Sequence, residues 1–161
     1  RPGVASEPVA AHNAAFKICI VCIRRMSTPT APESTLSPNV QRELVLRVMP
    51  MPADANANGD VFGGWIMAQV DLAGSVLPAR ISRGRIATVA VNEFIFKQPV
   101  SVGDLLSFYA SVVRIGRTSI TVHVEVVAER NPENPQAVKV TEANLTYVAI
   151  DKQGKPREIP R

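Results

Sequence analysis

The sequence predicts an α+β domain in which one long helix packs against a curved antiparallel sheet of five or six strands. Two observations lead to this prediction. From Gly63 onward, apolar residues recur at helical spacing, and the chain after Gly84 consists of runs with the composition of β-strands. A single helix must bury its apolar side, and the concave face of the sheet is the only partner large enough.

The first expected element is a strand over residues 41–49, where polar and apolar side chains alternate. Pro50 and Pro52 end this strand, because proline cannot donate to a sheet ladder. A loop of Asp, Asn, Ala and Gly follows over residues 53–60.

The helix is expected to begin at Gly63 and to run for about four turns. Pro78 removes one helical hydrogen bond, so a kink or an early end is expected there, with Arg83-Gly84 as the last possible stop. One helix face carries Gly64, Met67, Asp71, Gly74 and Ser75. This face has mainly small residues, so another backbone could approach it closely.

Four strands are predicted after the helix, over residues 86–96, 104–115, 119–129 and 138–150. The middle two are joined only by the short segment 116–118, which implies an antiparallel hairpin. The order is therefore strand, helix and four strands, within a single domain over residues 41–161.

Residues 1–40 are expected to be a disordered or extension segment. Residues 27–39 are rich in Ser, Thr and Pro, and residues 1–25 could be an artificial leader, a mis-assigned upstream start or a targeting extension. Three of the four net positive charges lie in residues 1–25. The rest of the chain is nearly neutral, without a basic stripe, so no nucleic-acid partner is expected.

Membrane insertion and export are not expected. The apolar run over residues 14–23 is broken by Lys17 and is too short to span a bilayer. Its positive charges follow it, whereas a secretory signal has them in front. Cys19 and Cys22 are the only cysteines, so no disulfide framework is expected and a zinc site is disfavoured. These features suit a cytoplasmic protein.

The most informative segment is residues 56–74, where a glycine-rich turn runs into an apolar helix that carries one carboxylate, Asp71. Gly63 and Gly64 lie where the loop becomes the helix, so their N–H groups are free and no side chain blocks an approaching carbonyl oxygen. Such a turn can hold an oxyanion. The alternative is structural, with Asp71 paired to an arginine and the glycines allowing close packing.

Several segments resemble YciA-type acyl-CoA thioesterases of the hot-dog fold. The resemblance covers residues 44–160 and is carried by the string Asn-Ala-Asn-Gly-Asp-Val-Phe-Gly-Gly-Trp-Ile-Met at residues 56–67, with matching segments at residues 89–93, 97–104, 116–119 and 148–157. It implies hydrolysis of acyl-CoA to a free acid and coenzyme A, within fatty acid metabolism. It also implies an active site between two protomers of a dimer, and dimers that assemble into a hexamer as a trimer of dimers.

The resemblance also implies residue roles. Asp71 is the general base on water or the nucleophile, Asn56 assists with Asn58 as the alternative, and Gly63 and Gly64 bind the oxyanion. The candidate coenzyme A contacts are Gly116, Arg117, Thr118, Ser119, Lys97, Arg85 and Arg157. Phe62 stands where many relatives have a histidine. No metal and no cofactor are expected, apart from the coenzyme A of the substrate.

Three alternatives to this activity follow from the same residues. The protein could be a non-catalytic acyl-CoA-binding or regulatory protein, or it could hydrolyse thioesters of acyl-carrier protein. Dehydratases of this fold use a histidine, but neither His12 nor His123 is near the helix start, and His123 is expected on a solvated strand face. Dehydration is therefore disfavoured.

Overall fold

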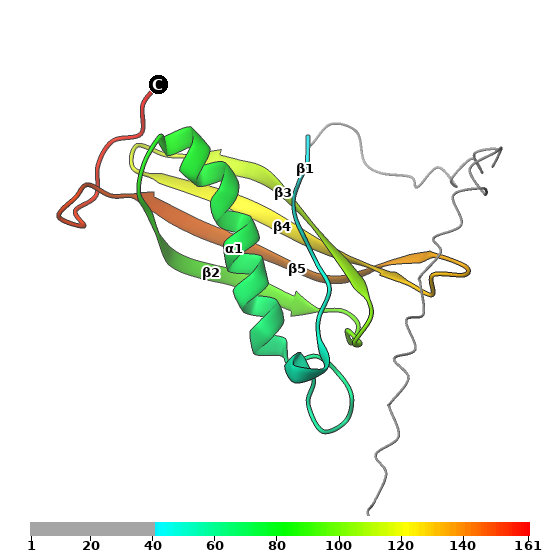
Figure 1. Ribbon diagram of the computed structural model, residues 1–161. Helices are drawn as coiled ribbons and strands as arrows, with labels where there is room; N and C mark the ends of the chain where they lie inside the picture. Colours follow the sequence, from blue (N-terminus) through cyan, green and yellow to red (C-terminus); the bar gives the residue numbers. More distant parts are fainter. Residues whose placement is uncertain (1–40) are drawn as a thin grey trace, which may run out of the picture. The chain divides into compact units, whose positions relative to one another are not determined.

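The computed structural model describes residues 41–161, and the predicted extension over residues 1–40 lies outside the described residues. The elements follow the predicted order (Figure 1). They are β1 (Glu43–Val48), the 3-10 turn η1 (Pro52–Asp54), α1 (Gly63–Ser82), β2 (Ile86–Phe96), β3 (Leu105–Ile115), β4 (Ser119–Arg130) and β5 (Gln136–Ala149).

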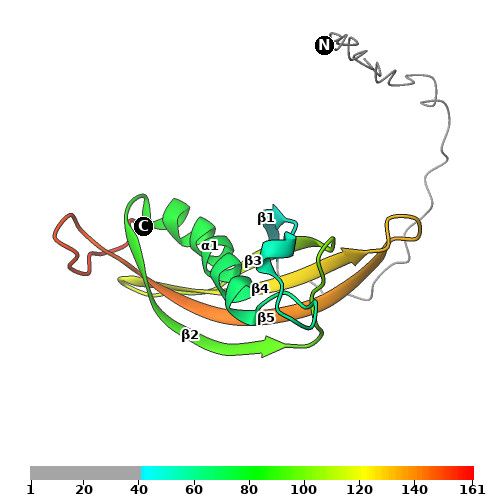
Figure 2. The same cartoon turned by 60° about the horizontal axis from the view of Figure 1, so that its bottom comes forward.

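The five strands form one sheet in the order β1-β3-β4-β5-β2, with every neighbouring pair antiparallel. The sheet curves around α1, which lies across its concave face and packs against all five strands (Figure 2). The predicted fold class is confirmed, with five strands. No described element covers the convex face of the sheet, which is turned away from α1 (Figure 2).

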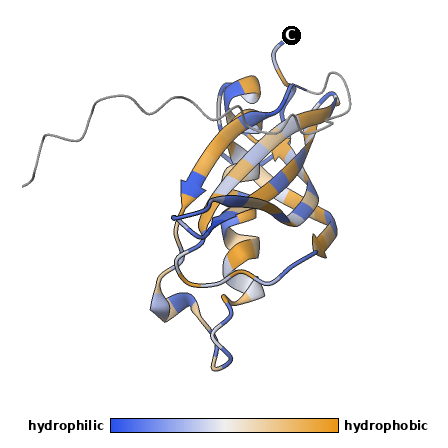
Figure 3. Ribbon diagram, turned by 90° about the vertical axis from the view of Figure 1, so that its right-hand side faces the viewer, coloured by the Kyte–Doolittle hydropathy of each residue, from blue (hydrophilic) through white to orange (hydrophobic). Residues whose placement is uncertain are grey.

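The core lies between α1 and the concave face because side chains alternate along the strands (Figure 3). On β4, Val122 and Val124 point to the helix and are fully buried, whereas His123 and Glu125 point to the convex face. The helix contributes Ile66 and Val70 to this core. The alternation thus separates an apolar interior from a polar outer face.

Helix α1 continues through Pro78 to Ser82, so it does not end at the proline but at the later of the two predicted positions, before Arg83-Gly84. Pro78 is buried among the residues that face the sheet. Burial of its ring and of the following turn offsets the missing hydrogen bond. The helix ends at Arg83, which adopts the left-handed conformation with φ 50°. Among residues 41–161, no helix is long and apolar enough to cross a membrane.

Strand β2 forms one edge of the sheet and is irregular. Its pairing with β5 shifts register between Thr88 and Ala90 and again between Asn92 and Ile95. Its apolar side chains remain largely exposed, at 57% for Val89 and 51% for Phe96. An apolar, unpaired edge next to α1 is a surface that another chain could cover.

Candidate active site

Asp71 lies in the third turn of α1 and is half-buried between the helix and the sheet. Its oxygen Oδ1 accepts a hydrogen bond of 2.8 Å from the hydroxyl of Thr88. The hydroxyl of Tyr147 lies 3.1 Å from the same Oδ1 and 2.9 Å from the main-chain oxygen of Asp71. Within residues 41–161, Oδ2 has no hydrogen-bond partner. The carboxylate is thus held by one oxygen and presents the other.

Strand pairing brings the two donors together. Thr88 on β2 is directly opposite Tyr147 on β5, so both side chains reach the same turn of α1. Burial raises the pKa of Tyr147, and the negative charge of Asp71 adds to this effect. The phenol therefore stays protonated and remains a hydrogen-bond donor. Sequence reasoning did not single out either residue, because they lie 17 and 76 positions from Asp71.

Among residues 41–161, Asp71 is not paired with an arginine, in contrast to the structural alternative. None of the ion pairs formed by residues 41–161 involves Asp71. Gly74, on the same helix face, is buried against the phenol of Tyr147 rather than against another backbone. The carboxylate is therefore surrounded by neutral hydroxyl donors, which hold it in place without neutralising its charge.

The glycine turn leaves two amides free at the start of α1. Trp65 and Ile66 donate their N–H groups to the carbonyl of Phe62. In the described chain, the N–H groups of Gly63 and Gly64 have no acceptor. A Cβ atom built at Gly64 would meet nothing within 4 Å, whereas one at Gly63 would lie 3.2 Å from Cζ of Phe96. Gly64 therefore faces open space and Gly63 faces an aromatic ring.

A cavity of about 350 Å³ opens beside this turn. It is lined by Asp60, Val61, Gly63, Ile66, Phe96, Lys97, Gln98, Pro99 and Val100. Most of these groups are apolar, and the first helical residue forms part of the wall. The cavity can therefore hold an apolar segment that leads toward the free amides.

Asn56 shapes the loop before the helix. Its Oδ1 accepts the N–H of Asn58 at 2.8 Å and that of Asp60 at 3.3 Å. Asn56 is half-buried, whereas Asn58 is exposed. Within residues 41–161, no hydrogen bond joins Asn56 to Asp71, so a single chain does not bring these two predicted residues together.

The candidate coenzyme A contacts divide between the two ends of β2. Arg85, Arg117 and Arg157 lie around the C-terminal end of α1, where Arg157 donates to the carbonyls of Ser82 at 2.7 Å and Ile150 at 3.2 Å. These bonds give Arg157 a structural role. Arg85 donates to the carbonyls of residues 151 and 152.

The side chain of Arg117 is 79% exposed, and within residues 41–161 its one ion pair is with Glu158, at 3.4 Å. It lies in the predicted tight turn, which is closed by the bond of 2.7 Å from the N–H of Gly116 to the carbonyl of Ser119. Lys97 lies at the opposite end of β2, beside the cavity, and forms an ion pair of 2.7 Å with Glu142.

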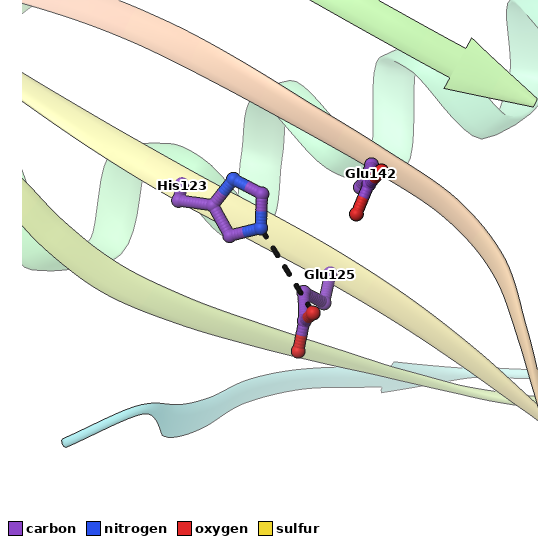
Figure 4. A group of neighbouring side chains, drawn as sticks. All are labelled: His123, Glu125 and Glu142. Carbon is purple, nitrogen blue, oxygen red and sulfur yellow. Dashed lines mark ion pairs between the residues drawn. The ribbon is translucent and has the colours of Figure 1, made fainter. Parts of the chain in front are cut away.

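A second polar cluster lies on the convex face of the sheet, away from Asp71. His123, Glu125 and Glu142 point toward one another there (Figure 4). The ammonium group of Lys139 forms ion pairs with both glutamates, so a cation of the protein already occupies the place of a metal. His123 lies on the polar convex face, as predicted, and there it is half-buried and hydrogen-bonded to Asn144 at 3.0 Å.

The fold and the site together define a class of protein. A helix wrapped by an antiparallel sheet is the hot-dog architecture, and its helix presents two free amides followed by an oriented carboxylate on the same face. This pair can stabilise an oxyanion and activate water, as hydrolysis of a thioester requires.

Comparison with known proteins identifies the family. The Thioesterase superfamily model matches residues 58–135. The acyl-CoA thioester hydrolase YciA of Salmonella typhimurium is 47% identical over 129 residues, which cover 79% of this chain and 97% of the relative. The chain belongs to the YciA family of acyl-CoA thioester hydrolases.

Solved structures agree with this identification. An aspartate-to-alanine mutant of a hexameric broad-specificity acyl-coenzyme A thioesterase is 44% identical and superimposes with a TM-score of 0.72, covering 74% of this chain and 87% of the other. A hexameric thioesterase from Yersinia pestis is 47% identical, with a TM-score of 0.70 and coverage of 74% and 96%. The predicted resemblance, fold and enzyme class are confirmed.

Proposed function

We propose that this acyl-CoA thioester hydrolase performs its reaction at Asp71, with the amides of Gly63 and Gly64 as the oxyanion site. The activity class follows from membership of the YciA family. The assignment to Asp71 rests on one observation, which is that Thr88 and Tyr147 hold Oδ1 and leave Oδ2 free. A fixed carboxylate with one open oxygen is what a general base needs.

The oxyanion site uses the start of the same helix. The N–H groups of Gly63 and Gly64 lack acceptors in the described chain and lie at the positive end of the helix dipole. A thioester carbonyl bound there would gain negative charge in the transition state, where such donors act most strongly. The open space beside Gly64 gives the carbonyl access.

The spacing of these groups is compatible with activation of water and with direct attack. Seven residues separate Gly64 from Asp71, or roughly 10 Å along the helix axis, and both lie on one face. The side chain of Asp71 leans toward the N-terminus and shortens this gap by about 2 Å. Direct attack spans about 7 Å from amide nitrogen to carboxylate oxygen, and an intervening water adds about 3 Å. The remaining separation of about 8 Å lies between the two values, so the spacing does not choose between the routes.

A second copy of the chain completes the site in this proposal. Asn56 does not reach Asp71 within one chain, and the apolar edge formed by β2 lies next to α1. We propose a dimer across this edge, with Asn56 of the partner subunit facing Asp71. Trimers of such dimers would give the hexamer reported for the solved relatives.

The proposed substrate binds through both of its ends. The cavity beside Gly63 receives the acyl chain, because its wall is mostly apolar. Arg117 and the turn 116–119 bind the phosphates of coenzyme A, with Arg85 beside them and Arg157 bracing the segment. Lys97 contributes from a second subunit. We propose a single domain over residues 41–161, no cofactor or metal, and a cytoplasmic location.

The test is release of free thiol from several acyl-CoAs by the wild type and by Asp71→Asn. The variant should lose about 10²-fold to 10⁴-fold in kcat, whereas Glu129→Gln, at an exposed pair on the outer face, should keep full activity. Equal rates in wild type and Asp71→Asn would reject the site. Thioesters of acyl-carrier protein with the same acyl chain should react more slowly than the acyl-CoAs. Faster reaction of the carrier-protein thioesters would show that coenzyme A is not the group that the enzyme recognises.

The role of Asp71 can be tested by one turnover in ¹⁸O-labelled water with enzyme in excess. Activation of water places one label in the free acid. Unlabelled acid in the first turnover would instead show that Asp71 attacks and forms an anhydride, which water opens at the aspartyl carbon.

A further inference from the structure

The phenol of Tyr147 is a buried polar group directed at the site. Its side chain is 1% exposed and is the largest among the fully buried residues. Its hydroxyl makes hydrogen bonds only to Asp71 within the described chain, at 2.9 Å to the main-chain oxygen and 3.1 Å to Oδ1. The single proton of the hydroxyl is thus shared between the backbone and the side chain of one residue.

Gly74 provides the space that this hydroxyl occupies. A Cβ atom at position 74 would lie 2.6 Å from the hydroxyl oxygen of Tyr147, a distance that real Cβ atoms do not adopt. It would lie 3.4 Å from Cζ of the same ring, which is ordinary contact. Of these two contacts, only the one with the hydroxyl oxygen is a clash, so a phenylalanine at position 147 would remove it. The hydroxyl also gives a reason for glycine at position 74, because glycine is otherwise unfavourable inside a helix.

We propose that Tyr147 is a positioning residue of the active site, whose hydroxyl fixes the orientation of Asp71, and that Gly74 is required to admit this hydroxyl. The inference rests on the proposed role of Asp71 as the active carboxylate. Thr88 supplies the second hydrogen bond to Oδ1 from β2. Two donors on one oxygen direct the free oxygen toward the substrate.

The groups around Asp71 supply hydrogen bonds and no opposite charge. Tyr147 faces it from β5 and Thr88 from β2, and no cation of the described chain lies within 4 Å of its carboxylate. Burial keeps the pKa of Tyr147 high, so this donor is neutral across the working range. Loss of the phenol hydroxyl therefore removes one of the two groups that hold Oδ1 of Asp71.

The experiment compares Tyr147→Phe with Tyr109→Phe in the full chain. Tyr109 is the only other tyrosine, and its ring lies 4.6 Å from the guanidinium carbon of Arg42, outside the site. Tyr147→Phe should lower kcat about tenfold and leave KM within about twofold. Tyr109→Phe should change neither value.

Gly74→Ala gives an independent test, because its effect should depend on residue 147. In the wild type it should displace the hydroxyl and lower kcat at least as much as Tyr147→Phe. In the Tyr147→Phe background it should cause no further loss, because the remaining close contact is with Cγ2 of Val124 at 3.3 Å, which can yield slightly. Melting temperatures of all variants show whether each one is folded.

The outcomes separate this inference from the proposed function. An inactive Asp71→Asn with an unchanged kcat in Tyr147→Phe would overturn the role of Tyr147 and keep that of Asp71. A loss of kcat in Tyr147→Phe that follows only a lower melting temperature would likewise overturn it, as a packing effect. An active Asp71→Asn would instead reject the site itself. If Gly74→Ala does not fold, the kcat and KM of Tyr147→Phe decide alone.

Discussion

The N–H group of Gly63 can be removed without breaking the helix. Gly63 is the first helical residue, where proline is accepted because the N–H has no partner in the helix. The preceding residue, Phe62, has φ −57° and ψ 131°, so it lies outside the α region that a following proline disfavours. Gly63→Pro therefore deletes one proposed oxyanion donor with little change of the backbone.

Gly63→Ala is the matched control for the size of this effect. Both variants add a Cβ atom 3.2 Å from Cζ of Phe96, so both move that ring slightly. Only the proline variant lacks the hydrogen. Loss of one oxyanion donor costs about 3 to 4 kcal/mol of transition-state stabilisation. If Gly63 donates, kcat of Gly63→Pro should be about 10²-fold to 10³-fold below that of Gly63→Ala, with similar KM values.

The assay is thiol release at saturating and at low acyl-CoA concentration, with the melting temperature measured for each variant. Equal kcat values in the alanine and proline variants would refute the role of the Gly63 N–H. The donor would then be the N–H group of Gly64. Gly64→Ala should leave the melting temperature unchanged, because nothing lies within 4 Å of the new methyl group. The methyl group should nevertheless hinder the approach of the thioester carbonyl and lower the activity.

Three further changes have defined outcomes. Thr88→Val should lower kcat about threefold to tenfold by removing the 2.8 Å bond to Asp71, which steady-state kinetics can measure. Glu142→Gln should cost about 1 to 2 kcal/mol of unfolding free energy at pH 7. Bonds from Lys139 and Lys97 lower the pKa of Glu142 from 4.5 to about 2, so the difference should be complete above pH 4.5 and vanish as pH falls toward 2 in urea titrations. Arg117→Ala should raise KM about threefold to tenfold for acyl-CoA but not for acyl-pantetheine, and equal effects on both would exclude a phosphate contact.

The sequence predicted the order of the elements because the local signals agreed. The period-two runs and the helical run are long, and Pro, Gly and Asn mark the boundaries between them. The strand ends therefore lie within two residues of the predictions. Pro78 is the exception. A proline inside a helix removes a hydrogen bond and tends to end the helix. Here the burial of Pro78 against the sheet outweighs that tendency, and the neighbouring residues in the sequence do not reveal this burial.

The candidate site was predictable only where its residues are close in sequence. Asp71 and the two glycines belong to one helix and its entry turn, so their spacing alone placed them on one face. Thr88 and Tyr147 reach Asp71 through strand pairing between β2 and β5. Within its strand, Tyr147 has the signature of an ordinary core residue, and the hydroxyl that gives it a role is invisible to hydrophobic patterning.

Strand β2 shows why alternation misleads beside the site. Alternation would place Val89 and Val91 toward the core and Thr88 toward solvent. In the structure Thr88 directs its hydroxyl to Asp71, while Val89 and Val91 are 57% and 45% exposed. The register shift between Thr88 and Ala90 interrupts the alternation, so Thr88, opposite the buried Tyr147, and Val91, opposite the buried Leu145, lie on one face although they are three positions apart. For an isolated domain two features of this strand are unfavourable, a bulge that interrupts its pairing with β5 and apolar side chains that stay exposed. Both features become favourable if one strand serves the carboxylate on its inner side and a second subunit along its edge.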